Sequence, residues 1–410
     1  MLKSKVNLVM SIANDSGNGF TKTFCQFADG TNDITVTPSL YASITENESI
    51  PKLAQDLLKI QNTIMDVVLK SPAIKNSSEY LVGEAAINKD SSQSYNVNTN
   101  EGKASPDISI ILPLTKIAYA ALNYIKAKKQ SIPSTINVKI ANYVTCLPIN
   151  EFKNEKNRET LTKRFTKGSH TVTIKNVEPQ VQVNISFASS NIFIYPEGII
   201  AQIGLIFNPD VKGAYRQGNL YKNSSFKDGK DYLKSSSNSN TLIVDIGDGT
   251  TDISIINALQ PIVGANFSLN QGVGTAAITA ADQLSVDYPQ LGHYSRAVFL
   301  EHARRNDNEG KILTSKYLEP QINRLSQAIL TQIEVLYKKV NNDIDTIVFL
   351  GGGINLLSER DKKFLQKEIS KLNPFKPEQK VWWIRERDAQ LLNLDGLRIM
   401  LLRKTRTRKK

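Results

Sequence analysis

The sequence predicts an α/β fold of two domains in which one structural unit is duplicated. An apolar run at residues 6–13 leads into the turn Asp-Ser-Gly-Asn-Gly at 15–19, and a second apolar run leads into Asp-Ile-Gly-Asp-Gly at 245–249. A strand-like run follows each turn, so both segments are predicted to be β-hairpins. A chain of 410 residues is also long for one hydrophobic core, which favours two domains. Because the two hairpins are more than 200 residues apart, we expect each half of the chain to direct one turn at a shared ligand.

Turns of this kind suit a phosphate group and its Mg²⁺. The backbone N–H groups between the strands face the anion, and carboxylates at the ends of the turn, such as Asp15 and Asp245, hold the metal, usually through waters. Gly247 and Gly249 are small where a ligand must come close. One such hairpin would fit an ordinary turn equally well, and the second copy is what favours the phosphate interpretation.

Lys22 follows Asp15 by seven residues and lies on the outgoing strand of the first hairpin. Its ammonium can reach a phosphate oxygen as a point charge. The alternative is an ordinary exposed lysine on a strand. The spacing from Asp15 favours the phosphate role.

Glu197 follows an apolar strand and Pro196, at the start of a predicted apolar helix that runs to Phe207. A proline suits the first turn of a helix, and a glutamate there is stabilised by the helix dipole. The functional alternative is an acid that points at the ligand and orients a water. The residues alone do not decide between the two.

Two further glycine turns are candidates for nucleotide contact. A buried strand at 344–350 ends in Gly351, Gly352 and Gly353, and only bare backbone can lie flat against a purine or an α-phosphate. A triple glycine is also simply a flexible turn. Gly274, in the Gly-Val-Gly turn that opens an alanine-rich helix, is included among the expected nucleotide-binding residues.

The composition is that of a globular protein in a reducing compartment. The 2 cysteines lie in apolar runs and the 3 histidines share no ligand spacing, which argues against a disulfide or a zinc site. The N-terminal apolar run breaks at Asn14-Asp15, and no run approaches the roughly 18 apolar residues of a membrane span. We therefore expect a cytoplasmic protein without a membrane segment.

The formal net charge is +12, and six cations lie in the last eight residues, 403–410. Such a tail is either a solvated, frayed terminus or a contact for nucleic acid or for an acidic partner surface. Two other segments are notable. Residues 51–70 have apolar residues at helical spacing and predict an amphipathic helix, and residues 208–240 read as a long polar surface insertion.

With these signals in order, the chain resembles the actin-type ATPase superfamily, which includes actins, DnaK-type chaperones and sugar kinases. The matching signals are a first phosphate hairpin, a connecting helix at Pro196-Glu197, a second phosphate hairpin and an adenosine turn at the triple glycine. Within the superfamily the chain is most similar to bacterial ParM-like plasmid-segregation actins. That choice depends on three further segments: Tyr80–Ala86, Leu147-Pro148 and the closing helix in 387–397.

The resemblance implies an actin-like fold of two domains, each a mixed five-stranded sheet flanked by helices, with Mg-ATP in the cleft between them. Domain I would span 1–195, with a small subdomain at about 35–105, and would be completed by the C-terminal helix at about 388–402. Domain II would span 196–387, and the basic tail 403–410 would follow.

The resemblance also implies roles for single residues. Asp15 and Asp245 would hold Mg²⁺ through waters, Glu197 would orient the attacking water, and Lys22 would neutralise the phosphates. The residues lining the phosphates would be Gly17, Asn18, Gly19, Gly247, Asp248, Gly249 and Thr250. Gly351, Gly352 and Gly353 would contact adenosine. A water-positioning acid typically contributes on the order of 10²–10⁴ in rate.

The leading hypothesis is a filament-forming ATPase that polymerises with Mg-ATP and segregates plasmid DNA through an adaptor protein bound at a plasmid centromere. GTP is the alternative nucleotide. A sugar-type kinase of the same superfamily is the alternative function, but no catalytic aspartate or sugar pocket stands out beyond the phosphate turns. A chaperone would need a substrate domain after residue 400, and a membrane-bound cell-shape actin would need an anchor, for which residues 1–10 are poor.

Overall fold

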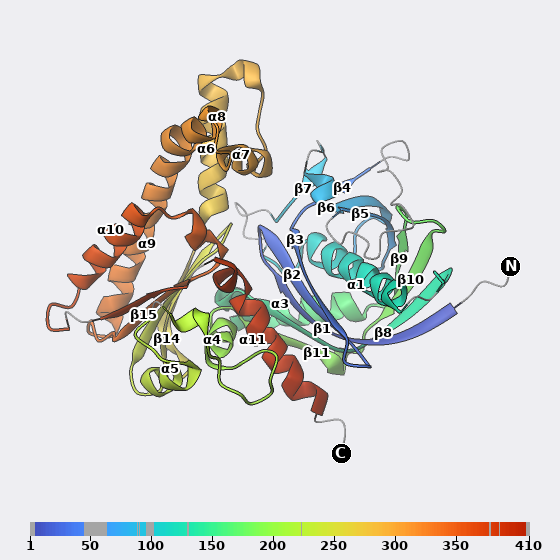
Figure 1. Cartoon of the computed structure of the whole chain (residues 1–410), viewed down its shortest axis with the longest axis horizontal. Helices are drawn as coiled ribbons and strands as arrows, with labels where there is room; N and C mark the ends of the chain where they lie inside the picture. The colour runs from blue at the N-terminus through green and yellow to red at the C-terminus, as the bar shows by residue number, and fades with distance from the viewer. Residues whose placement is uncertain are drawn as a thin grey trace. The chain divides into compact units, whose positions relative to one another are not determined.

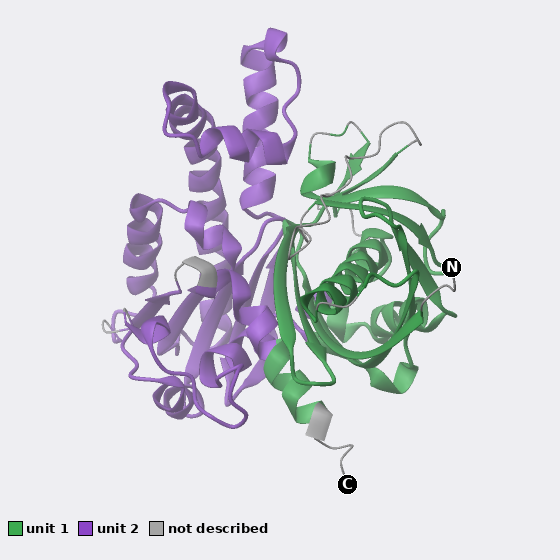
Figure 2. Ribbon diagram, turned by 45° about the vertical axis from the view of Figure 1, so that its right-hand side comes forward, with its two compact units in different colours: residues 1–147, 151–195, 397–410 green, residues 148–150, 196–396 purple. Residues whose placement is uncertain are grey.

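The computed structural model describes residues 5–44, 64–87, 89, 91–95, 102–128, 131–222, 224–376, 379–384 and 386–406. The chain forms two compact units (Figure 2). The first unit contains residues 1–147, 151–195 and 397–410, and the second contains 148–150 and 196–396. Each unit is built on its own sheet.

Five strands of the first unit form the module that carries its turn. β1 (Lys5–Ser16), β2 (Phe20–Phe27) and β3 (Asn32–Pro38) make an antiparallel meander. On its other side β1 runs parallel to β8 (Thr135–Leu147), and β8 runs parallel to β10 (Val181–Ser186). The long apolar runs of β1 and β8 suit strands that are buried on both faces.

The five strands of the second unit repeat this order. β12 (Asn240–Ile246), β13 (Thr251–Asn257) and β14 (Gln260–Leu269) form the meander, and β12 then runs parallel to β15 (Thr346–Leu350), which runs parallel to β16 (Lys380–Trp383). The two modules therefore share strand order and direction, as expected for a duplicated unit.

Two compact α/β units are present as predicted, with one correction to the strand count. The sheet of the second unit has five strands, but that of the first has eleven. The additional strands extend the first module from β10 or pair with β8: β4 (Tyr41–Ser43), β5 (Ile64–Lys70), β6 (Ser78–Gly83), β7 (Ser92–Gln93), β9 (His170–Ile174) and β11 (Ile192–Pro196). The larger sheet arises because strands from about 41–93 join the module rather than forming a separate layer.

The helices cover these sheets (Figure 1). In the first unit they are α1 (Ile108–Ala127), α2 (Ile149–Lys153, whose first two residues belong to the second unit) and α3 (Glu155–Thr166). The second unit contains α4 (Ile199–Ile206), α5 (Gly229–Ser236), α6 (Val273–Asp287), α7 (Arg296–Ala303), α8 (Asn308–Ile312), a π-helix at Leu313–Leu318, α9 (Glu319–Lys339) and α10 (Glu359–Ser370). The last helix, α11 (Glu386–Arg406), gives its first part to the second unit and its residues from 397 to the first. Short 3-10 turns lie at Glu84–Ala86, Ser189–Asn191, Asn219–Tyr221, Pro289–Leu291 and Gly352–Leu356.

Helix α1 forms the core of the first unit. It is long and apolar enough to cross a membrane, yet 94% of its most apolar stretch is buried inside the unit. It packs against strands β1, β2, β5 and β9. Burial of this kind is the pattern of a core helix.

The predicted helix at 51–70 is wrong where the structure describes it. Residues 51–63 lie outside the described residues, and Ile64–Lys70 is strand β5. Met65, Val67 and Leu69 are fully buried. These residues recur every second position, as a strand requires. A short apolar run can fit both this spacing and the 3.6-residue spacing of a helix.

Candidate functional site

The two hairpins have the same geometry. In the first, Asp15 lies opposite Lys22 and Ser16 opposite Thr21. In the second, Asp245 lies opposite Asp252 and Ile246 opposite Thr251. Each pair of strands therefore encloses a loop of equal length, and Lys22 and Asp252 occupy equivalent positions.

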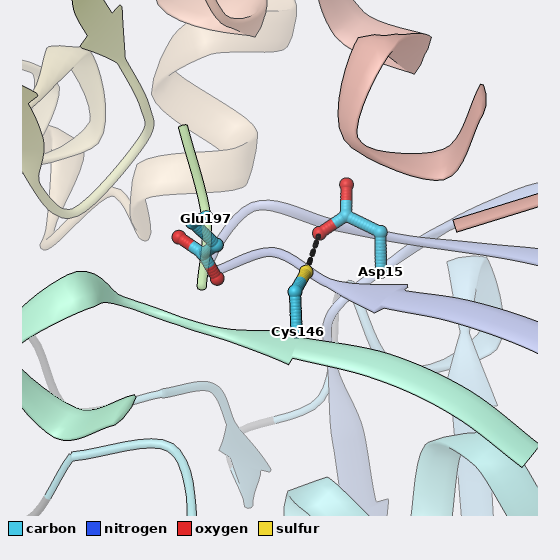
Figure 3. Close-up of side chains that lie close together, drawn as sticks. All are labelled: Asp15, Cys146 and Glu197. Carbon is cyan, nitrogen blue, oxygen red and sulfur yellow. Dashed lines mark hydrogen bonds between the residues drawn. The ribbon is translucent and has the colours of Figure 1, made fainter. Parts of the chain in front are cut away.

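Asp15 is buried and has two partners in the first unit. Lys22 Nζ lies 2.8 Å from Asp15 Oδ2, with side-chain exposures of 13% and 3%. The Cys146 thiol donates to Asp15 Oδ1 at 3.7 Å (Figure 3). The sequence analysis assigned no role to the cysteines, which lie in apolar runs, but the end of β8 lies beside β1 and brings the Cys146 thiol to the site. The Lys22 ammonium has three donors, so it can hold Asp15 and contact a second anion.

The first turn is fixed by hydrogen bonds from outside the hairpin. Ser39 donates through Oγ to Gly17 O at 2.6 Å and through its backbone N–H to Gly19 O at 2.9 Å. A Cβ on Gly17 would lie 2.7 Å from Phe20 O and 3.0 Å from Lys22 Nζ. Gly17 is therefore required by the close approach of its own turn. Asn18, at the middle of the turn, is half-buried.

The second hairpin has a different charge pattern. Asp245 and Asp252 are directly opposite and both are buried. Like charges at such positions are destabilising, which is a reason for a cation to be held there. The Thr250 hydroxyl donates to Asp252 Oδ2 at 3.3 Å, and Gly247 N–H closes the turn on Thr250 O at 2.9 Å. Asp252 was not among the predicted ligands. It could have been found from the sequence, because it follows Asp245 by seven residues just as Lys22 follows Asp15.

Asp248 forms an ion pair with Arg296, the first residue of α7. The same turn is attached to the start of α6, because Val273 N–H donates to Gly247 O at 3.1 Å and Gly274 N–H to Asp248 O at 2.7 Å. A Cβ on Gly274 would lie 2.5 Å from the Asp248 carboxylate. Gly274 therefore contacts the turn of the second hairpin, and Arg296 is a residue that the sequence analysis missed.

The triple glycine meets the same hairpin. β15 is the parallel neighbour of β12, so that Leu350 pairs with Asp245 and the glycines follow directly. A Cβ on Gly351, whose φ is +92°, would clash with Asp245 Oδ1. A Cβ on Gly353 would lie 2.7 Å from Ile246 O. Gly352 is more open. At Gly351 and Gly353 side chains are excluded by the backbone and carboxylate of the second hairpin.

The closing helix α11 presents three residues at intervals of three to this region. Gln390 Cγ would lie 3.7 Å from a Cβ on Gly352. Asn393 Nδ2 donates to Asp245 Oδ2 at 3.2 Å. Gly396 packs on α4 so closely that a Cβ would clash with Ile200 O. This spacing places all three residues on one side of the helix.

Glu197 lies in the second unit, between β11 and α4, and is buried. The helix begins at Ile199 rather than at Pro196, so Glu197 precedes the first helical turn, and Gly198, with φ of +76°, separates the two. A Cβ on Gly198 would lie 3.7 Å from Ser254 Oγ of β13. Glu197 is thus followed by a glycine that lies next to the outgoing strand of the second hairpin, and it stands two residues before the first residue of α4.

A cavity of about 280 Å³ lies beside the segment that follows the triple glycine. Its walls come from α7, the π-helix, α9, the 3-10 turn at Gly352–Leu356 and α10. They include Leu300, Arg304, Leu318, Asn355, Leu357 and Asp361. It is near the lower size of small-molecule pockets and has their mixture of apolar walls and a few polar groups. The sequence analysis did not find these residues, which lie on or next to five separate elements.

In each unit, the predicted residues thus gather at the carboxyl ends of the central parallel strands. Buried carboxylates beside hydroxyl and amide groups are oxygen-rich donor sets of the kind that Mg²⁺ prefers. The side chains at the second hairpin, where the Thr250 hydroxyl and the Asn393 amide lie beside the two aspartates, therefore fit a magnesium ion in the chemistry of their donors, whereas Asp15 contacts the Lys22 ammonium and the Cys146 thiol.

Two family models match the chain. Residues 13–199 match the N-terminal domain of actin-like proteins, and residues 243–363 match the C-terminal domain of archaeal MreB-like actin homologues. The chain belongs to the actin-like proteins. No curated protein sequence matches it significantly.

Solved structures with this fold cover nearly the whole chain. The actin-like protein Alp7A matches with a TM-score of 0.68 and 17% identity over 98% of each chain. A 15-stranded ParM filament from Clostridium botulinum matches with a TM-score of 0.61 and 18% identity, over 97% of this chain and 99% of that one. Bacillus thuringiensis ParM with ATP matches with a TM-score of 0.54 and 14% identity, over 97% and 99%.

Proposed function

We propose that this protein is a cytoplasmic ATPase that polymerises with Mg-ATP, hydrolyses it in the filament and segregates plasmid DNA through an adaptor protein. One observation carries most of the proposal: in the second unit the Asp245 turn, the start of α6 and the triple glycine converge on one place. Among proteins of the same fold, one was solved as a ParM filament and one with ATP.

In this proposal the buried carboxylates hold the metal and the turns hold the phosphates. Asp15 and Asp245 would ligate Mg²⁺ through waters, with Asp252 contributing the second carboxylate of its hairpin. Bound Mg²⁺ neutralises charge that develops on the phosphates. Lys22 would add a point charge from the first turn. Glu197 would orient the water that attacks the terminal phosphate.

We further infer that the cavity beside the triple glycine receives the nucleotide base. Arg304 can stack on a purine through its planar guanidinium. Asn355 and Asp361 line the same cavity, and Asp361 Oδ2 accepts from the N–H and hydroxyl of Ser358 at the start of α10. ATP and GTP differ at the edge that these groups would meet. Competition between the two nucleotides in a binding assay decides the preference.

Self-association needs exposed surface that can meet a second copy. Phe375 and Val263 are 94% and 96% exposed, and Val286, at the end of α6, is 72% exposed. A contact between different patches on two copies repeats without closing and so produces a filament. These side chains are our candidates for that contact.

The basic tail is a candidate for binding DNA or the adaptor. Its first four residues, 403–406, are the end of α11, and Lys404 Nζ lies 4.2 Å from the centre of the Phe193 ring on β11. That contact anchors the helix end in the first unit, while residues 407–410 lie outside the described residues. Deleting Arg403 to Lys410 should weaken salt-dependent binding to DNA or adaptor, because released counterions drive such binding. If the deletion leaves the salt dependence of binding unchanged, the tail contacts neither DNA nor the adaptor and is simply solvated.

The decisive experiment is light scattering of the wild-type protein with and without Mg-ATP, together with phosphate release. We expect scattering to rise with Mg-ATP and phosphate to follow. Glu197→Ala should bind ATP normally, release phosphate on the order of 10²-fold more slowly and give longer-lived filaments. Transfer of phosphate to a sugar without a rise in scattering would instead support the kinase. Unchanged turnover in Glu197→Ala would remove Glu197 from the mechanism.

A further inference from the structure

The segment 208–240, expected to be a surface excursion, is packed firmly in the second unit. Phe207 and Tyr215 stack at 5.7 Å between ring centres. Farther along, Tyr221, Phe226 and Tyr232 surround Trp382 of β16, with ring centres 5.1, 5.7 and 5.7 Å away. The segment therefore has a fixed position from which a side chain can act on neighbouring helices.

Arg216 is that side chain. It is 13% exposed, and its guanidinium contacts two helices at once. It donates to Gly204 O of α4 at 3.0 Å and to Asp395 Oδ2 of α11 at 2.7 Å, and its other nitrogen lies 3.4 Å from Asp388 Oδ1. Its own backbone N–H donates to Ile206 O at 2.9 Å. A planar fork of donors suits this arrangement, and a point charge does not.

The two helices that Arg216 joins cross with their backbones in contact. A Cβ on Gly204 would lie 2.6 Å from Leu392 O, and one on Gly396 would clash with Ile200 O. No side chain separates the helices at this crossing. Their relative orientation therefore depends on contacts at its edge, where Arg216 lies.

Both helices lead to the candidate site. α4 follows the turn that carries Glu197, and α11 carries Asn393, which donates to Asp245. Asp395, the strongest partner of Arg216, is two residues from Asn393. A shift of α11 along α4 would therefore move the Asn393 amide away from the Asp245 carboxylate.

We propose that Arg216 is a positioning residue of the nucleotide site, which holds α11 against α4 so that Asn393 stays on Asp245. The proposal rests on the ATPase function proposed above. In this proposal the packed segment 208–240 supports the backbone from which the Arg216 side chain reaches α4 and α11. Because Arg216 contacts none of the phosphate turns, its loss should affect the geometry of catalysis more than nucleotide affinity.

The test compares Arg216→Ala and Arg216→Lys with the wild type, and uses Lys212→Ala as a matched control, since Lys212 is an exposed cation of the same segment. We expect kcat to fall about tenfold to a hundredfold in Arg216→Ala, the scale for a displacement of about 1 Å, with KM changed less than about threefold. Arg216→Lys should recover thermal stability but only part of kcat. Lys212→Ala should match the wild type.

Removing Arg216 alone leaves the Asp395 carboxylate buried without this partner, which can unfold the protein. The double variant Arg216→Ala/Asp395→Asn avoids that charge and should keep the low kcat. Hydrogen exchange of residues 386–396, measured without nucleotide, should rise in both variants. Wild-type kcat in the double variant, or unchanged exchange in 386–396, would overturn the proposal. If the wild-type protein has no ATPase activity, the proposed function is wrong. The exchange measurement would still show whether Arg216 holds α11 in place, because it is made without nucleotide.

Discussion

Lys22 Nζ and Asp15 Oδ2 form an ion pair of 2.8 Å directly across the first hairpin, where the second hairpin has two carboxylates, Asp245 and Asp252. The duplicated turns therefore differ in charge. The first pairs its aspartate with a cation inside the hairpin, and the second sets two carboxylates against each other. In the proposed function, Lys22 would contact the phosphates at the first turn, and Asp252 would join Asp15 and Asp245 as a carboxylate that holds the metal.

Replacing Lys22 with Met should weaken both stability and Mg-ATP binding. The buried Asp15 carboxylate loses its cation, which costs about 3 kcal/mol of unfolding free energy for a buried pair. A lost charged contact to phosphate, on the order of 1.5–3 kcal/mol, should raise the Kd for Mg-ATP by about tenfold or more. Urea unfolding and nucleotide titration measure the two effects.

Lys22→Arg is the matched control, since it keeps the charge and should keep most of the stability. If Lys22→Met loses stability but binds Mg-ATP like the wild type, the lysine serves the hairpin and has no role at the phosphate.

Arg296→Ala should weaken nucleotide binding through Asp248. Arg296 forms an ion pair with Asp248, which belongs to the turn that we propose lines the phosphates, and both side chains are mostly buried. Without Arg296 the negative charge of Asp248 repels a phosphate at short range. The Kd for Mg-ATP should rise about tenfold, on the scale of one charged contact.

The double variant Arg296→Ala/Asp248→Asn separates charge from packing, because it removes the repulsion and should restore most of the affinity. Arg324→Ala, a change at an exposed arginine of α9, is the control. Equal affinity losses in the single and double variants would contradict the electrostatic explanation.

Both hairpins could be predicted because the residues that specify each of them are close together in the sequence. An apolar run, an aspartate, two glycines and a second run lie within about fifteen residues, and the structure has the paired strands where the pattern puts them. The same is true of the triple glycine after β15. The residue types that a tight turn requires are visible without any knowledge of the fold.

The partners of these turns were not predictable in that way. Arg296, Cys146 and Asn393 reach the turns from elements distant in sequence, and only strand order and helix packing bring them there. The five strands that the family resemblance implied for the first unit were too few, because six further strands join its sheet and strand pairing is a tertiary property. Long-range contacts override local periodicity when an apolar run is short.

Gly396→Ala should destabilise the second unit. The added methyl would clash with Ile200 O at the crossing of α4 and α11, where backbone atoms leave no room. Overpacking of this kind costs about 1–3 kcal/mol, seen as a lower midpoint in urea. Gly352→Ala, where the nearest atom is Gln390 Cγ at 3.7 Å, is the control and should unfold like the wild type. If the wild type, Gly396→Ala and Gly352→Ala unfold at the same urea midpoint, α4 and α11 can move apart to admit the methyl group without loss of stability.

The buried Lys116 side chain should make the stability of the first unit depend on pH. The side chain lies in α1, is 2% exposed and donates to the Thr37 hydroxyl. Burial lowers the pKa of Lys116 from 10.5 to about 7, against the smaller opposing effects of Cys25 and Asp33. In the unfolded chain the lysine stays protonated up to about pH 10.5, so between pH 7 and 10.5 the unfolded state binds more protons than the native state.

Stability should therefore rise with pH through this window, by at most about 1.4 kcal/mol per pH unit for one proton. The burial penalty of the charged ammonium is present below pH 7 and is relieved as the native lysine deprotonates. Urea unfolding at pH 7.5, 8.5 and 9.5 measures the slope, and Lys116→Met, which cannot titrate, supplies the reference for all other groups. The wild-type curve should climb relative to that of the variant. Parallel curves would show that Lys116 keeps its ordinary pKa in the folded protein, with its ammonium reaching water or a counter-charge.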